Sequence, residues 1–371
     1  MPHIGVGGAE RQLRFLIVHS DPAKIRHDVL YYSDARDLDE LRHYQQAGIS
    51  LHRVPRNKRR PLRFIRDLAW AIRERRPDVV HCWLVSGGIW GRLAALRAGC
   101  GSILVAYRNT SVFRPGIVHW VERLTQHRVQ HLGNSRACAA AVAEVVKVPL
   151  AKFAVVYNGV AIPDPVSGAA RARLRQEFGI PEGHQMVVTV GRLSPQKNYP
   201  MLLRVAQRAR GRLAVRFVIA GHGELEPELR SLAAELGVAD LVHFAGLRHD
   251  VPAIFGSGDV FCYTTSFEGF PNVLLEAMAG GLPIVTTGFA GADELIEDGL
   301  NGRIVPLDDD AAAFAALQQI CEDGDLATRL GQNARATVAE RFSMEQMVAN
   351  TLKIYQKMLH EHGCRPNDRD N

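Results

Sequence analysis

The sequence SFEGFPNVLLEAMAGGLPIVTT, residues 266–287, contains a polar loop, a turn, a short helix and an apolar strand in immediate succession. The loop follows an apolar strand at 259–264 and carries Glu268, and the helix after the Phe-Pro-Asn turn carries Glu276. Such a loop places carboxylates beside the free backbone N–H groups of a helix N-terminus. The stretch therefore predicts an α/β fold and a site for a ligand that is both hydroxylated and anionic, such as a nucleotide sugar.

Short apolar segments alternate with longer amphipathic segments along the whole chain. Several of them are continuous apolar runs, which is typical of parallel strands buried on both faces. The alternation indicates βαβ units and two Rossmann-like, doubly wound domains that bind ligands in a cleft at the carboxyl ends of their strands. The expected strands are 79–84, 103–107, 129–133, 153–157, 186–191, 215–220, 242–245, 259–264 and 283–287.

Proline, glycine and polar residues are concentrated at 160–185, which predicts a linker between two domains. We expect a first domain at 1–165, a donor-binding domain at 166–345, and a segment at 346–371. This last segment should form a helix that packs back on the first domain, followed by a polar tail.

The stretch GVGGAERQ, residues 5–12, has the pattern of a glycine turn that opens a helix. In a doubly wound fold such a turn follows a strand, yet only four residues precede it. We therefore expect the first strand of the sheet to be missing from this sequence and the natural chain to be longer by roughly 10–20 residues.

Charge is distributed unevenly over the 371 residues, which have a net charge of +6. Residues 1–165 contain 25 Lys and Arg against 13 Asp and Glu, whereas residues 166–371 contain 20 against 26. The six cysteines are scattered without a CxxC pair, which is typical of reduced thiols and of neither a zinc site nor a disulfide framework. With no long apolar stretch, we expect a cytoplasmic protein, peripheral on the inner face of the plasma membrane.

The densest basic cluster lies at 53–76 and has two interpretations. It can be a solvated helix face, or a surface for anionic lipid headgroups in which arginines lie beside apolar side chains. A nucleic-acid surface is disfavoured because no aromatic-interleaved binding motif accompanies the charge. The apolar side chains in question are Leu62, Phe64, Ile65 and Trp70.

Taken together, the motifs resemble those of glycosyltransferase family 4. They are GGAERQ (7–12), VVYNGV (155–160), VGRLSPQKN (190–198), AGHGELEPEL (220–229), GLRHDVPAIF (246–255) and EGFPNVLLEAMAGGLPIVTT (268–287). The resemblance covers almost the whole chain and implies the GT-B fold. It also implies retaining transfer of a sugar from a nucleotide-sugar donor, UDP- or GDP-linked, with no cofactor and no divalent metal.

The resemblance assigns the catalytic roles to four residues. Arg192 and Lys197 are expected to stabilise the negative charge that develops on the leaving diphosphate. Glu268 is expected beside the donor sugar. His81, at the end of the run Asp78-Val-Val-His, is expected to reach the same sugar, although a structural role is the commoner one for a lone histidine after a strand.

Donor binding is assigned to a second group of residues. Glu276 is expected to bind the ribose hydroxyls, since a carboxylate suits a vicinal diol. The start of its helix is expected to offer backbone N–H groups to phosphate or sugar, and Leu247 is expected to border the nucleobase. The remaining donor-binding residues are Gly7, Gly8, Gly191, Gly221, Gly223, Asn272, Val273 and Leu274.

The expected activity is transfer to a glycolipid or lipid-linked saccharide in bacterial cell-surface polysaccharide synthesis. Two alternatives remain open. One is a nucleotide-sugar epimerase or a phosphorylase of the same architecture, although no pyridoxal-lysine motif is visible. The other is an inactive scaffold that binds sugar nucleotides. Product analysis distinguishes the epimerase, which needs no acceptor.

Overall fold

The computed structural model describes residues 1–5, 7–34, 38–57, 59–108 and 117–361. The chain divides into two compact units, of which the first joins Met1–Gly159 to the segment from Met344 onward and the second is Val160–Ser343. The division lies at 159/160 and not at 165/166 as predicted. The predicted polar tail, 363–371, lies outside the described residues.

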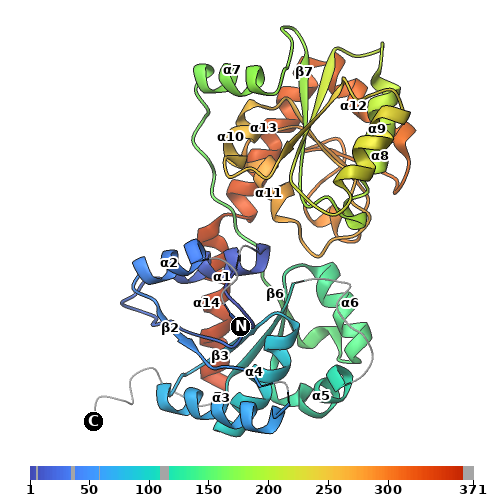
Figure 1. Ribbon diagram of the computed structural model, residues 1–371. Coiled ribbons are helices and arrows are strands. Elements are labelled where there is room, and N and C mark those ends of the chain that lie inside the picture. The colour runs from blue at the N-terminus through green and yellow to red at the C-terminus, as the bar shows by residue number, and fades with distance from the viewer. Residues whose placement is uncertain (6, 35–37, 58, 109–116, 362–371) are drawn as a thin grey trace. The chain divides into compact units, whose positions relative to one another are not determined.

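The first unit contains parallel strands in two separate groups (Figure 1). One sheet has the order β3 (Val80–Trp83), β4 (Ile103–Tyr107), β5 (Gln130–Gly133) and β6 (Phe153–Val155), and a pair is formed by β1 (Asp28–Tyr31) and β2 (Ser50–Arg53). The helices are α1 (Gly8–Val18), α2 (Leu38–Gln46), α3 (Pro61–Arg75), α4 (Val85–Ala98), α5 (Ile117–Thr125), α6 (Arg136–Val146) and α14 (Met344–Glu361).

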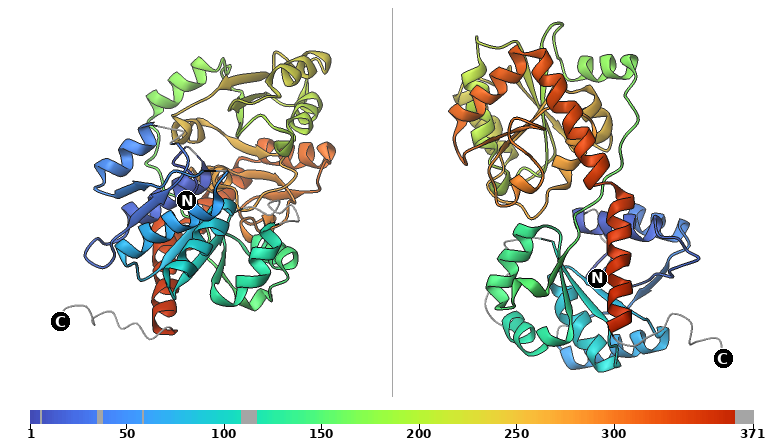
Figure 2. Two further views of the ribbon diagram at one scale, coloured as in Figure 1. Left: turned by 60° about the horizontal axis from the view of Figure 1, so that its bottom comes forward. Right: turned by 180° about the vertical axis from the view of Figure 1, so that it is seen from behind.

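Two apolar cores lie on the two faces of the β3–β6 sheet, because successive side chains of a strand point to opposite faces. Ile103 and Val105 of β4 pack in one core with α3, α4 and α6. Leu104 and Ala106 pack in the other with α1 and α14. The last helix thus completes the first unit (Figure 2).

The second unit has a six-stranded parallel sheet in the order β12-β11-β10-β7-β8-β9. Its strands are β7 (Gln185–Val190), β8 (Val215–Ala220), β9 (Val242–Gly246), β10 (Val260–Tyr263), β11 (Ile284–Thr287) and β12 (Arg303–Val305). Its helices are α7 (Gly168–Glu177), α8 (Tyr199–Ala209), α9 (Glu226–Glu235), α10 (Val251–Ser257), α11 (Asn272–Ala279), α12 (Asp310–Glu322) and α13 (Gly324–Arg341). The strand order reverses between β7 and β10, and a doubly wound sheet binds its ligands at such a point.

The predicted α/β fold class with Rossmann-like sheets is confirmed, and each predicted strand corresponds to an observed one. The predicted linker at 160–185 is too long: residues 161–167 form no helix or strand, but the helix α7 follows directly. Arg171 and Arg175 of this helix form ion pairs with Asp259 at 2.5 and 2.7 Å. The sequence analysis also missed β1, β2 and β12, which have only three or four residues each.

Candidate functional site

Two loops meet at the reversal point of the second sheet, one after β7 and one after β10. The strands are adjacent, with Val187 opposite Val260. The Ser266 amide donates to Gln196 O at 2.8 Å, and the Thr264 hydroxyl donates to Lys197 O at 3.1 Å. These bonds hold the two predicted catalytic loops against each other.

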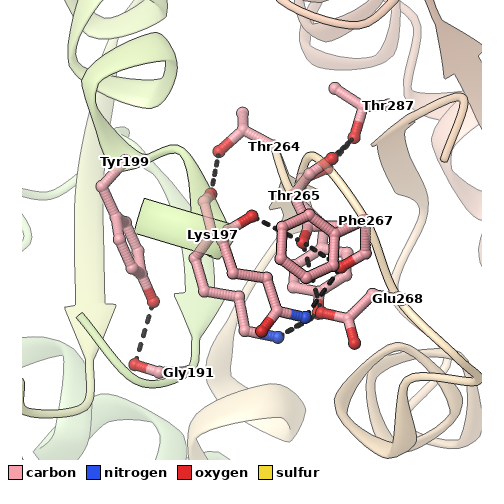
Figure 3. A network of polar contacts seen from close by, with 10 residues as sticks. Gly191, Lys197, Tyr199, Thr264, Thr265, Phe267, Glu268 and Thr287 are labelled. Atoms are coloured by element: carbon pink, nitrogen blue, oxygen red, sulfur yellow. Dashed lines mark hydrogen bonds and ion pairs between the residues drawn. The ribbon is translucent and has the colours of Figure 1, made fainter. Parts of the chain in front are cut away.

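The centre of the site is a cluster of Lys197, Tyr263, Thr265 and Glu268. Figure 3 shows Lys197, Thr265 and Glu268 of this cluster. Glu268 Oε1 accepts hydrogen bonds from Lys197 Nζ, from Tyr263 Oη at 2.6 Å and from Thr265 Oγ1 at 3.2 Å. Lys197 Nζ also donates to Tyr263 Oη at 2.6 Å. Only 9% of Glu268 is exposed, so the Lys197–Glu268 ion pair is poorly screened by water.

The tyrosine hydroxyl in this cluster stays protonated. Burial raises the pKa of Tyr263 well above its ordinary value, and the neighbouring Glu268 carboxylate raises it further. Tyr263 therefore donates to the carboxylate and fixes its orientation together with Thr265. These hydrogen bonds fix the charged groups of the cluster in place, which is the arrangement that makes electrostatic stabilisation effective.

Arg192 differs from Lys197 in its surroundings. It lies two residues beyond the end of β7, it is exposed, and it forms no ion pair with any residue in the described part of the chain. The charge of Lys197 is offset by Glu268, whereas the guanidinium of Arg192 is offset by no carboxylate among these residues. Of the two predicted cations, Arg192 is thus the one available to a diphosphate without breaking an existing pair.

Two of the predicted donor-binding glycines are required by packing between loops. The loops after β7 and β8 lie backbone to backbone, so that a Cβ on Gly221 would lie 1.9 Å from Gly191 O. A Cβ on Gly223 would lie 2.3 Å from Leu193 O. The Tyr199 hydroxyl also donates to Gly191 O at 2.9 Å. This packing explains Gly221 and Gly223 without a ligand, whereas a Cβ on Gly191 would meet only the side chains of Tyr199 and Lys197, at 3.2 and 3.4 Å.

The start of α11 offers fewer donors than predicted. The amides of Leu274 and Leu275 both donate to Pro271 O, at 3.2 and 3.4 Å, and Leu274 is fully buried. The prediction that Leu274 binds the donor is therefore not supported, which leaves Asn272 and Val273 at this helix start. Both residues are partly exposed, as is Glu276 in the next turn.

Leu247 follows β9, and 60% of it is exposed. The contact of Leu247 with a nucleobase thus stays a prediction. Among the described residues, no group of three or more His, Cys, Asp or Glu side chains is placed to hold a metal ion.

The other predicted site residues belong to the first unit. His81 Nδ1 lies 2.7 Å from the hydroxyl of Tyr355 on α14, and the imidazole lies against Trp83 with ring centroids 4.8 Å apart. These contacts favour the structural interpretation of His81 over a contact with sugar. At the start of α1, the Glu10 carboxylate lies against Gly7, where an added Cβ would be 2.0 Å from it.

Tyr263 and Thr265 were missed in the sequence analysis. Tyr263 ends an apolar strand, where an aromatic residue indicates core packing. Its hydroxyl gains a role only because the sheet order brings Lys197 beside it, 66 positions away in the sequence. The available signal was the hydroxyl-bearing run Tyr-Thr-Thr at 263–265, which begins at the end of an apolar strand.

Two parallel-sheet units, with a charged cluster at the reversal point of the second, define the fold of GT-B glycosyltransferases. The Anabaena protein HepE, solved in complex with UDP, superposes with a TM-score of 0.85 at 21% identity, over 96% of this chain and all of that one. The family model described as Glycosyltransferase Family 4 matches residues 6–162, and that described as Glycosyl transferases group 1 matches residues 170–337. The chain belongs to glycosyltransferase family 4.

Curated relatives match over most of the chain. An uncharacterized glycosyltransferase of Methanocaldococcus jannaschii is 26% identical over 361 residues, which is 89% of this chain and 90% of that protein. The UDP-Gal:α-D-GlcNAc-diphosphoundecaprenol α-1,3-galactosyltransferase of Escherichia coli is 25% identical over 304 residues, or 78% of this chain and 77% of that protein.

Proposed function

We propose that this chain transfers a sugar, with retention of anomeric configuration, from a nucleotide-sugar donor to a lipid-linked saccharide or glycolipid in the synthesis of cell-surface polysaccharide. The observation that carries the proposal is the organised Lys197–Tyr263–Glu268 cluster at the reversal point of the sheet, with the uncompensated Arg192 beside it in the same loop. A UDP-sugar and a diphospho-polyprenol acceptor are favoured by the name of the Escherichia coli relative.

The chemical problem in this transfer is the departure of the nucleoside diphosphate. As the bond between the anomeric carbon and the phosphate oxygen breaks, negative charge develops on the diphosphate, and fixed cations lower the energy of that state. Arg192 would grip two phosphate oxygens, since a guanidinium binds bidentately. Lys197 would supply a point charge that Glu268 and Tyr263 already hold in place.

Retention requires the acceptor hydroxyl to attack on the face from which the diphosphate leaves. In this mechanism the acceptor oxygen forms the new bond to the anomeric carbon, and the departing phosphate oxygen takes the acceptor proton. The protein would contribute placement and charge stabilisation, without a cofactor and without a divalent metal. Glu276 would bind the ribose, and Leu247 would lie against the base.

Membrane association would bring the enzyme to a lipid-linked acceptor. Helix α3 exposes Leu62 (81%) and Trp70 (62%), with Arg63 and Arg66 between them. Phe64 is only 1% exposed and packs in the core, so the prediction that it faces lipid is wrong, and Lys58 of the same cluster lies outside the described residues. No helix among the described residues is long and apolar enough to cross a bilayer.

The experiment combines donor screening with product analysis. A thermal-shift panel of UDP-, GDP-, ADP- and CMP-sugars identifies the donor, and NMR of the product of transfer to an undecaprenyl-diphosphate saccharide gives its anomeric configuration. We expect stabilisation by one nucleotide class and a product with the configuration of the donor. Inversion would refute the mechanism, and release of an epimerised sugar without an acceptor would favour the epimerase.

A further inference from the structure

The carboxyl ends of the strands β3, β4, β5 and β6 bring together a group of side chains in the first unit. Trp83 ends β3, Arg108 directly follows β4, Asn134 directly follows β5, and Asn158 lies three positions after β6. The strands are parallel and adjacent in this order, so these ends lie at one edge of the sheet. Doubly wound sheets bind their ligands outside this edge.

Arg108 is the charged member of this group, and both of its side-chain partners are neutral. Its Nη1 donates to Asn158 Oδ1 at 2.6 Å, and its Cζ lies 4.1 Å from the centre of the Trp83 ring. Its Nε is buried and donates to no residue that the structure describes. Within the described part of the chain, no carboxylate forms an ion pair with Arg108, so its positive charge is not offset there.

A second arginine of the same unit has the counter-charge that Arg108 lacks. Arg92 of α4 is fully buried and is paired with Glu122 at 2.5 Å. Burial would lower the pKa of Arg92, but its hydrogen bonds to Glu122 raise that pKa above its ordinary value. At Arg108 burial has no such opponent and lowers the pKa to about 10. Arg108 therefore remains a cation at neutral pH, in surroundings that disfavour a charge.

A cation in such surroundings costs stability unless an anion joins it. A methionine would cover the Trp83 ring without that cost, so packing alone does not account for a guanidinium. Arg108 is only partly buried, and its Nη2 forms no hydrogen bond with a described residue. An anion can therefore reach Nη2 while Nη1 keeps its bond to Asn158. Phosphate is a suitable anion because a guanidinium forms strong, charge-assisted hydrogen bonds with it.

Asn134 adds an unused hydrogen-bond acceptor beside Arg108. Only 2% of Asn134 is exposed, and its Nδ2 donates to the backbone oxygen of Arg108 at 3.4 Å. Its Oδ1 is buried and receives no hydrogen bond from a described residue. Buried polar atoms rarely lack a partner, and a hydroxyl group of a ligand would supply the missing donor. The two unmet groups together fit a ligand that carries both a phosphate and hydroxyls.

We propose that this edge of the first unit binds the phosphate-bearing end of the acceptor, with Arg108 on the phosphate that links sugar to lipid and Asn134 accepting from a hydroxyl of that sugar. The inference rests on the proposed function, which makes the acceptor a lipid-linked saccharide or a glycolipid. Of these two classes it selects the phosphate-linked one, because an uncharged glycolipid would leave Arg108 without an anion.

The test is the binding of α-glucose 1-phosphate, a sugar with a phosphate on its anomeric oxygen, to the full chain by isothermal titration calorimetry. The nucleoside diphosphate identified in the donor screen is present at saturation, so that the sugar phosphate does not occupy the donor site. Arg108→Gln should raise the Kd by about 10-fold or more, the usual effect of losing a hydrogen bond to a charged group. Arg97→Gln, which removes an exposed arginine from the last turn of α4, should leave the Kd unchanged.

Two further measurements keep the proposal testable if Arg108→Gln fails to fold. Methyl α-glucoside has no phosphate and should bind the unaltered chain about 10-fold more weakly or worse than the sugar phosphate. Asn158→Asp places a carboxylate 2.6 Å from Arg108 Nη1, which supplies the counter-charge and should weaken binding of the sugar phosphate by a similar factor. Equal binding of the two sugars, or an unchanged Kd in folded Arg108→Gln or Asn158→Asp, would overturn the proposal.

Kinetics distinguish the acceptor phosphate from the donor phosphates. In Arg108→Gln the KM for an undecaprenyl-diphosphate saccharide should rise by about 10-fold, while the Kd of the nucleoside diphosphate stays the same. An equal loss of nucleotide affinity would assign Arg108 to the donor and overturn the proposal. An absence of transfer by the unaltered chain would refute the proposed function, whereas the binding of the sugar phosphate decides the role of Arg108, so the two failures are distinguishable.

Discussion

Replacement of Lys197 by alanine separates two roles of this residue, in folding and in catalysis. In the structure its ammonium group is paired with Glu268, and the two side chains are 15% and 11% exposed. Removal of one partner of a fully buried pair costs about 3–5 kcal/mol. Because this pair is slightly exposed and Glu268 keeps its bonds from Tyr263 and Thr265, we expect a loss of about 2–3 kcal/mol.

This loss should lower the melting midpoint by about 5–10 °C, given the size of the second unit. If Lys197 also stabilises the departing diphosphate, turnover should fall by about 100-fold or more, the usual effect of removing one such donor. The two effects are measured by calorimetry and by transfer from the nucleotide sugar at saturating concentration.

The double variant Lys197→Met/Glu268→Gln distinguishes these roles. A neutral, well-packed pair of similar volume restores most of the stability, because no unpaired charge is left buried. It supplies no cation, so turnover should stay low. Recovery of turnover together with stability would refute a catalytic role for Lys197, and so would normal turnover in the single variant.

Three further predictions concern stability and membrane binding. Burial lowers the pKa of His131 to about 4, below the 6.5 of an exposed histidine, so the unfolded chain binds more protons between these pH values. Acidification through this pH range should therefore lower the unfolding free energy by up to about 3 kcal/mol. His131→Phe should make the unfolding free energy depend less on pH, as measured by urea titrations at different pH values. Arg92 (0% exposed) is paired with Glu122 (2%) through two contacts of 2.5 Å. Arg92→Leu should therefore lower the unfolding free energy, measured by urea denaturation, by about 3–5 kcal/mol, and Arg92→Met/Glu122→Leu should recover most of that loss. A double variant as unstable as Arg92→Leu would contradict this prediction. Arg63→Ser should weaken binding to phosphatidylcholine vesicles containing phosphatidylglycerol by about fivefold in a flotation assay, because each arginine near an anionic surface contributes about 1 kcal/mol of binding free energy. Unchanged binding would exclude α3 from the contact with the membrane.

The loops of the site were predictable from the sequence, but their contacts were not. The run at 266–287 predicted a strand, a loop with Glu268 and a helix with Glu276, and the structure has these elements at these positions. The ion pair of Glu268 with Lys197 spans 71 positions and depends on β7 lying beside β10. Strand order is a property of the whole sheet, so local pattern does not reveal it.

Other errors had local causes. The prediction of a linker at 160–185 followed its Pro and Gly content, but these residues flank the helix α7 rather than interrupt it. The grouping of Phe64 with Leu62 and Trp70 ignored the helical period of 3.6 residues, which places Phe64 on the buried face of α3 and the other two on the exposed face. Gly221 and Gly223 were assigned to the ligand, whereas packing between the loops already requires them.

The most direct test of the central claim is the turnover of Arg192→Ala, measured beside Arg329→Ala, which removes an exposed arginine from α13. Arg192 is exposed and forms no ion pair within the described part of the chain, so its loss should leave the melting midpoint unchanged. The account predicts a fall in kcat of about 100-fold for Arg192→Ala and none for Arg329→Ala. An unchanged kcat in a folded Arg192→Ala variant would contradict the assignment of this loop to the leaving diphosphate.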